Sequence, residues 1–315
     1  MRILALPFMI LLGLSALTAG PLPVGSARFV FSAPYPITVF TYKPAGFDHG
    51  PLLVVCHGVN RDAEEYRNHA IAMAEKFKAI VVAPRFDAGR FKSERYQRGG
   101  VLRNGRPQPR DQWTYAIVHR LVAQVRAKEG RPDMPCSLIG HSAGGQFLAR
   151  MAAFDPGDVC RIVVSNPSSC LFPTRAIPFG YGFGNLPPEL SSDQVMRAYL
   201  ASPLTFYLGT GDTVSDANFD ASPAAMRQGM SRLARGRACY EMGRKLAAKR
   251  GWTFNWRKVE IQGVGHCAPR MFAANQAGNA LFGTTRQSHR LRLHHPVRAA
   301  PLHARRHRPT PRRPV

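Results

Sequence analysis

The chain has 315 residues, of which 45% are hydrophobic, so it is long enough for one large domain with a full core. Its 43 lysines and arginines against 19 acidic residues give a formal net charge of +24, which raises anionic molecules and surfaces as partners. Its six cysteines form no Cys-x-x-Cys pair and no cysteine–histidine cluster with zinc-ligand spacing. We therefore expect no metal site, and nothing else in the sequence indicates a cofactor.

The first 27 residues have the organisation of a secretory signal peptide. Met1-Arg2 gives a positive start, residues 3–18 form an uncharged apolar run, and small residues at 18–20 and 25–27 predict cleavage near 20 or 27. The run is short for a membrane span of about 20 residues, so we favour a cleaved signal over an anchor helix. The sequence therefore predicts a secreted or periplasmic protein.

An oxidising compartment permits disulfides among the six cysteines. Cys56 and Cys136 fall inside predicted strands, so we expect them to be buried as small hydrophobic residues. The pairing of the other four is left open.

From residue 28 to residue 283, apolar runs of strand length alternate with segments of helical spacing. The predicted strands are residues 37–42, 51–56, 79–83, 136–139, 161–165, 204–208 and 253–260. Three helices are predicted to begin at an acidic capping pattern at 62–65, at Asp111 and after Ser142. Two more are predicted at 224–250 and 269–281. This alternation indicates the α/β class, with one mostly parallel sheet covered by helices on both faces. We place a single domain at 28–283, with an insertion at 166–203 that is rich in proline, glycine and aromatic residues.

Residues 284–315 form a tail rich in arginine, histidine and proline. Residues 286–315 alone contain nine arginines, five histidines and no acidic residue. Such a segment cannot bury a core, so we expect it to be disordered. Contact with an anionic surface is one interpretation, but we favour a solvated tail without a role. Since no base-reading module is visible, no specific nucleic-acid partner is expected.

The pentapeptide Gly140-His141-Ser142-Ala143-Gly144 lies between a predicted strand and a predicted helix. Strand, G-x-S-x-G and helix is the context of a nucleophile elbow, in which a sharp turn exposes the serine. Gly140 and Gly144 are needed because side chains there would meet the neighbouring strand and helix. A pentapeptide of this kind also arises by chance, so its weight depends on the partners of Ser142.

A serine hydroxyl is a poor nucleophile at neutral pH and needs a base. His266 directly follows the last predicted strand, at the sheet edge where the elbow should also lie. Asp212 follows the strand at 204–208 and would hold the imidazole in the tautomer that accepts the serine proton. Asp216 and Asp220 lie in the same loop and remain rivals of Asp212.

Negative charge develops on the substrate oxygen during acyl transfer, so two backbone donors are also expected. One is the N–H of Ala143, the residue after the nucleophile. The other is the N–H of Val59 in the loop His57-Gly58-Val59-Asn60, which follows the strand at 51–56.

Together these residues resemble the α/β-hydrolase superfamily over residues 37–281. The order serine, aspartate, histidine is that of its triad. Within it, His57-Gly58-Val59-Asn60-Arg61 followed by Tyr66 is similar to secreted bacterial esterases and polyhydroxybutyrate-depolymerase-like proteins. The resemblance implies a sheet of about eight strands and a secreted serine hydrolase that cleaves carboxylic esters through an acyl-serine intermediate. It does not account for the basic tail.

Substrate choice is expected to depend on the insertion. Its aromatic residues would form an apolar wall over the acyl group of a small or polymeric ester, or would simply pack onto the sheet; they are Phe172, Phe179, Tyr181 and Phe183. Residues 85–110 carry eight lysines and arginines against two acidic residues, which would attract an acidic substrate or, as we favour, form a solvated surface.

Two other functions fit the same residues. One is a non-catalytic α/β-hydrolase-like binding protein with the tail as its anchor, and the intact serine, aspartate and histidine argue against it. The other is an acyltransferase or a peptidase that uses the same triad.

Overall fold

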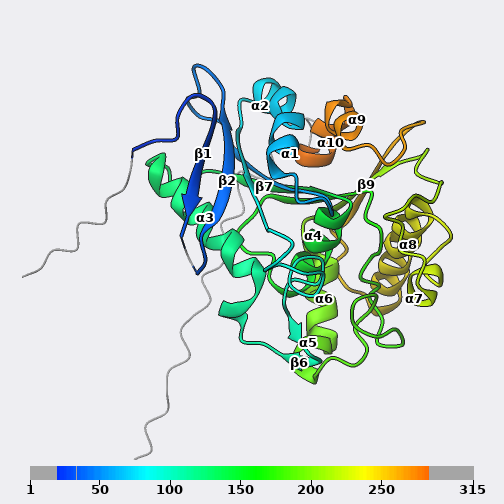
Figure 1. Ribbon diagram of the computed structural model, residues 1–315. Helices are drawn as coiled ribbons and strands as arrows, with labels where there is room; N and C mark the ends of the chain where they lie inside the picture. Colours follow the sequence, from blue (N-terminus) through cyan, green and yellow to red (C-terminus); the bar gives the residue numbers. More distant parts are fainter. Residues whose placement is uncertain (1–19, 33, 284–315) are drawn as a thin grey trace, which may run out of the picture. The chain divides into compact units, whose positions relative to one another are not determined.

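The computed structural model describes residues 20–32 and 34–283 (Figure 1). The predictions for the signal region before residue 20 and for the tail at 284–315 lie outside these residues. The strands of the main sheet are β1 (Gly25–Phe31), β2 (Ile37–Lys43), β3 (Leu52–Cys56), β4 (Ile80–Pro84), β7 (Cys136–His141), β8 (Arg161–Ser165), β9 (Leu204–Gly209) and β10 (Arg257–Ile261).

The eight strands form one sheet in the order β1-β2-β4-β3-β7-β8-β9-β10. The first two pairings, β1 with β2 and β2 with β4, are antiparallel, and every later pairing is parallel. The carboxyl ends of the parallel strands therefore meet at one edge. Loops that follow neighbouring parallel strands are brought together there, and this edge is where ligands bind in open α/β sheets.

Helices cover both faces of the sheet, as Figure 1 shows. The helices are α1 (Ala63–His69), α2 (Ile71–Phe77), α3 (Thr114–Lys128), α4 (Ala143–Phe154), α5 (Pro188–Ser191), α6 (Asp193–Ala201), α7 (Pro223–Met226), α8 (Arg232–Arg250), α9 (Ala268–Ala273) and α10 (Gln276–Phe282). Side chains alternate along the central strands. Leu138 of β7 belongs to the core beneath α3, α4 and α8, and Ile139 belongs to the core beneath α1, α2, α9 and α10. The fully buried strands explain the continuous apolar runs in the sequence.

The α/β fold with a mostly parallel sheet is confirmed, and the sheet contains one strand that the sequence did not indicate. β1 has an alternating pattern of half-buried and exposed residues because it is the edge strand and pairs only with β2. Because its residues are only half buried and it adjoins the predicted signal peptide, its hydrophobic pattern is weak and does not predict a strand.

The single helix predicted at 224–250 is wrong, because two helices occupy this segment. α7 ends at Met226 and α8 begins at Arg232. Gly229 lies between them with φ of +150°, a conformation that interrupts a right-handed helix. The break allows Arg232, as the first residue of α8, to reach the acidic loop that follows β9.

Two further boundaries differ from the predictions. Asp111 lies in a short 3-10 turn (Arg110–Gln112) and α3 starts at Thr114. The insertion at 166–203 carries two helices, α5 and α6, beside its irregular segments.

All six cysteines are free thiols in the structure, and Cys56 and Cys136 are buried within their strands, as expected. None of the helices within residues 20–32 and 34–283 combines the length and the apolar character that crossing a membrane requires.

Candidate active site

Ser142 lies at the tip of a sharp turn between β7 and α4. Its backbone has φ of 56° and ψ of −116°, a region that costs a residue with a side chain about 1–3 kcal/mol. A Cβ atom on Gly140 would lie 2.4 Å from the carbonyl oxygen of Gly144, and one on Gly144 would lie 2.2 Å from that of Cys56. The two glycines therefore allow the strand and the helix to approach closely enough to form this turn.

His266 and Asp212 are joined by a hydrogen bond. Nδ1 of His266 lies 2.9 Å from Oδ2 of Asp212, whose side chain is almost completely buried. Asp212 follows β9 and His266 follows β10, and these two strands are parallel neighbours. The structure thus brings Asp212 to the histidine, whereas the other two acidic candidates, Asp216 and Asp220, bond to other groups.

His266 also lies beside the elbow. The centre of its ring is 4.5 Å from that of His141, the residue before Ser142. Within the described residues no hydrogen bond joins His266 to the hydroxyl of Ser142. Catalytic hydrogen bonds in unliganded enzymes are commonly long and shorten when substrate binds.

Arg232 contacts two carboxylates of the acidic loop, and sequence reasoning missed it because it was one basic residue among many in a predicted helix. The side chain is fully buried, with Nη1 3.5 Å from Oδ1 of Asp212 and Nη2 2.7 Å from Oδ1 of Asp216. The hydrogen bond from Arg232 lowers the pKa of Asp216. One guanidinium therefore forms ion pairs with both carboxylates, and it faces the Oδ1 side of Asp212 without a hydrogen bond to it.

The loop after β3 is fixed by His57. The N–H of Phe86 donates to Nε2 of His57 over 3.0 Å, so the proton is on Nδ1, which donates to the carbonyl oxygen of Gly58 over 2.8 Å. The N–H of Val59 has no acceptor among the described residues, and Ala143 is the first residue of α4, where N–H groups lack intrahelical acceptors. Both predicted oxyanion donors are thus left available.

The two buried histidines of this region predict a loss of stability in mild acid. Burial lowers the pKa of His57 to about 3 and holds that of His141 well below its usual value. The unfolded chain therefore binds more protons below pH 6.5, and the free energy of unfolding should fall by about 1.4 kcal/mol per pH unit for each histidine. Urea unfolding at pH 7, 6 and 5 measures this slope. His57→Gln should reduce it by about one proton relative to the parent. An equal slope in His57→Gln would contradict the assignment.

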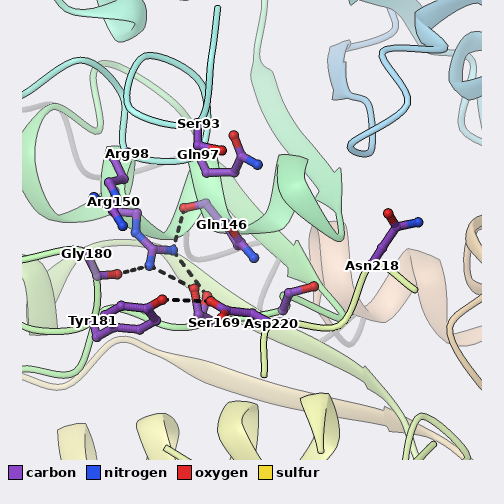
Figure 2. Close-up of a pocket in the computed structure, with 11 residues that line it drawn as sticks. Ser93, Gln97, Arg98, Gln146, Arg150, Ser169, Gly180, Tyr181, Asn218 and Asp220 are labelled. Atoms are coloured by element: carbon purple, nitrogen blue, oxygen red, sulfur yellow. Dashed lines mark hydrogen bonds between the residues drawn. The ribbon is translucent and has the colours of Figure 1, made fainter. Parts of the chain in front are cut away.

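A cavity of about 220 Å³ lies along α4 (Figure 2). It is enclosed by residues 93–98, by Gln146 and Arg150 of α4, by the loop after β8, and by the loop after β9. Of the four aromatic residues predicted to line the substrate site, only Tyr181 reaches this cavity. Phe172 and Phe183 belong to the hydrophobic core, and Phe179 packs on Phe154 with ring centres 5.8 Å apart.

For Phe172 and Phe183 the burial favours the other alternative, packing within the fold, because both side chains belong to the hydrophobic core. The lining of the cavity consists mainly of hydrogen-bonding and charged groups. Composition alone indicated aromatic residues in the insertion but not which of them would be buried.

Two solved structures are similar to this chain over most of their length. A poly(3-hydroxybutyrate) depolymerase, LpqC from Bordetella parapertussis, is 32% identical, with 85% of this chain and 94% of that chain covered and a TM-score of 0.75. Poly(aspartic acid) hydrolase-1 from Sphingomonas sp. KT-1 is 33% identical, with 79% and 96% covered and a TM-score of 0.75. No protein-family model matches the sequence, and no curated protein matches it. On this fold and this similarity, the chain belongs to the α/β-hydrolase superfamily, among its poly(3-hydroxybutyrate)-depolymerase-like members.

Proposed function

We propose that the protein is a serine hydrolase that cleaves carboxylic esters through an acyl-serine intermediate. The observation that carries the proposal is the hydrogen bond between His266 and Asp212 beside the strained Ser142. Ser142, Asp212 and His266 each follow a strand of the parallel part of the sheet, which supports their acting together at its carboxyl edge.

Each residue then has a defined role. His266 takes the proton of Ser142 as the hydroxyl attacks the ester carbonyl, and Asp212 stabilises the imidazolium that forms. The N–H groups of Val59 and Ala143 donate to the oxyanion, each contributing about 3 kcal/mol to transition-state stabilisation. His266 returns the proton to the leaving alcohol. Water then attacks the acyl-enzyme and gives a proton to His266, which passes it to Oγ of Ser142 as the carboxylic acid leaves.

The substrate class follows from the relatives. One acts by name on poly(3-hydroxybutyrate) and the other on poly(aspartic acid). We infer that this chain hydrolyses a polymeric ester or a small ester that corresponds to one of its units.

Covalent labelling tests the proposal directly. A fluorophosphonate should label the folded protein once, on the peptide that contains Ser142, and should abolish hydrolysis of 4-nitrophenyl butyrate in proportion to labelling. Absence of labelling in folded protein would favour a binding protein. Labelling without ester hydrolysis, but with transfer to an added alcohol or cleavage of peptides, would favour an acyltransferase or a peptidase.

We further propose that the chain is exported and cleaved near residue 20, and not near 27. Leu22 is 5% exposed, and its N–H donates to Oε1 of Glu129 over 2.8 Å. Cleavage near 27 would remove Leu22 and the first residues of β1, which pair with β2. Intact-mass measurement on protein collected from the periplasm or medium should give a chain that retains Leu22. An N-terminus at residue 28 would contradict this prediction.

A further inference from the structure

The polar cavity along α4 is lined by residues that contact the segments of the nucleophile and the acid. Gln146, in its lining, donates its backbone N–H to the carbonyl oxygen of Ser142 over 3.0 Å. Ser168, also in the lining, accepts from Nε of Arg232 over 3.2 Å, and Arg232 contacts Asp212. The cavity therefore lies one helical turn from the nucleophile, and Arg232 links its lining to the acid.

Arg150 brings a buried positive charge to this cavity without a counter-ion. The residue is 1% exposed, and its two Nη atoms donate to Ser169 and to the carbonyl oxygens of Gln146 and Gly180. Its Nε has no hydrogen-bond partner, and no carboxylate among the described residues forms an ion pair with it. Burying a cation without an anion is unfavourable, so this arrangement favours an anion that arrives from outside.

A second guanidinium lies close to the first. Figure 2 shows Arg98 next to Arg150, with Gly180 beside them. A Cβ atom on Gly180 would lie 3.2 Å from Nε of Arg98 and 3.3 Å from its Cζ, so Arg98 lies across the same glycine to which Arg150 donates. Within the described part of the chain, the side chain of Arg98 makes no hydrogen bond or ion pair. The two positive charges repel each other, so Arg98 makes the burial of the Arg150 cation still more unfavourable.

The carboxylate in the cavity does not neutralise this pair. Oδ2 of Asp220 accepts from the hydroxyl of Tyr181 over 2.8 Å, and Oδ1 accepts from the N–H of Ser222 over 3.1 Å. Its two oxygens are therefore already engaged, and the donors that remain for a ligand are the guanidinium of Arg98 and Nε of Arg150.

We propose that the cavity is a substrate subsite for a free carboxylate, recognised by Arg98 and Arg150. The inference rests on the proposed ester hydrolysis and adds the substrate class, an ester that carries an ionised carboxyl group near the scissile bond. The free guanidinium of Arg98 can bind a carboxylate through paired, charge-assisted hydrogen bonds. Arg150, whose Nη donors are already used, contributes its positive charge and its unpartnered Nε. A volume of about 220 Å³ accommodates one small unit of such a substrate.

Pairs of esters that differ only in charge test the subsite. Monoethyl succinate and ethyl succinamate place a carboxylate or a neutral amide in the acyl part. 3-Acetoxybutyrate and 3-acetoxybutyramide place it in the alcohol part. In one of these pairs, kcat/KM measured by pH-stat should be at least about tenfold higher for the anion, the value of a charge-assisted hydrogen bond.

Arg98→Gln and Arg103→Gln form a matched pair of variants. Both residues are exposed arginines of the same basic segment, but only Arg98 lines the cavity. Arg98→Gln should reduce the anion-to-amide ratio at least fivefold, and Arg103→Gln should leave it unchanged. Arg150→Gln should reduce the ratio further if the variant folds, and the Arg98 pair tests the proposal in either case.

The possible results distinguish failure of the proposed carboxylate subsite from failure of the proposed ester hydrolysis. A ratio near one in both pairs, or an equal loss in Arg98→Gln and Arg103→Gln, would overturn the carboxylate subsite while leaving ester hydrolysis intact. Absence of hydrolysis of all four esters, together with absence of fluorophosphonate labelling, would overturn the proposed function itself.

Discussion

Replacing Ser142 by alanine should reduce kcat for ester hydrolysis by about 10⁶-fold, the effect of removing a nucleophile that acts as one unit with its base. The backbone of Ser142 is held at φ of 56° by the contacts of Gly140 and Gly144, and these contacts do not involve the hydroxyl. Alanine meets the same strain as serine, so the variant should fold as the parent does. Initial rates on 4-nitrophenyl butyrate, with circular dichroism and urea unfolding as measures of the fold, check both parts of the prediction.

A serine-to-alanine change elsewhere in the same region provides the control. Ser215 is exposed in the loop after β9, and Ser215→Ala should keep parental kcat. If Ser142→Ala retained more than about one per cent of parental turnover in a preparation free of contaminating esterase, the acyl-serine mechanism would be wrong.

The sequence predicted most of the fold because the central strands are buried on both faces. The segments Leu52–Cys56 and Ile80–Pro84 are continuous apolar runs, and a short run of that kind between polar segments is a strand with few alternatives. The same reasoning missed Gly25–Phe31, whose residues alternate between partial burial and exposure at the sheet edge. Periodicity identifies what is buried, and an edge strand is only half buried.

The candidate triad could also be predicted, because parallel strands deliver the residues that follow them to one edge. Ser142, Asp212 and His266 each follow a strand, and the order of the strands brings their loops together. The sequence alone could not decide whether Asp212 or Asp216 is the carboxylate that bonds to His266. The answer depends on which carboxylate reaches the imidazole and which reaches Arg232, and both lie within the same five residues.

The polar cavity was beyond sequence reasoning for a different reason. Arg150 lies in the middle of α4 among apolar residues, where a charged side chain would ordinarily be assigned to the solvent face. Only the three-dimensional arrangement shows that the insertion covers this face and leaves the guanidinium with Gly180 and Ser169 as partners. Two of the aromatic residues that suggested an apolar site, Phe179 and Phe183, instead pack on Phe154 of α4.

Replacing Asp212 by asparagine should lower kcat by about 10⁴-fold, through the wrong tautomer of His266. In the parent, Oδ2 accepts the hydrogen bond from Nδ1 of His266, which leaves Nε2 free to accept the proton of Ser142. Asp216→Asn is the matched control. It removes a carboxylate from the same guanidinium but none from the imidazole, so kcat should change less than tenfold. Steady-state kinetics on 4-nitrophenyl butyrate compare the two variants, and similar losses would place the acid function elsewhere.

Arg232 determines which way the new amide would turn. Its Nη1 lies 3.5 Å from Oδ1 of Asp212, so the amide oxygen of asparagine is drawn to that side and the amide NH₂ faces His266. A donor at Nδ1 requires that nitrogen to be unprotonated, which puts the proton on Nε2, where it blocks acceptance from Ser142. The opposite orientation would direct NH₂ at a buried cation, which offers no acceptor. The buried guanidinium thus excludes the one orientation in which asparagine would replace aspartate, and the loss of kcat follows from the geometry around Arg232 as much as from the lost charge.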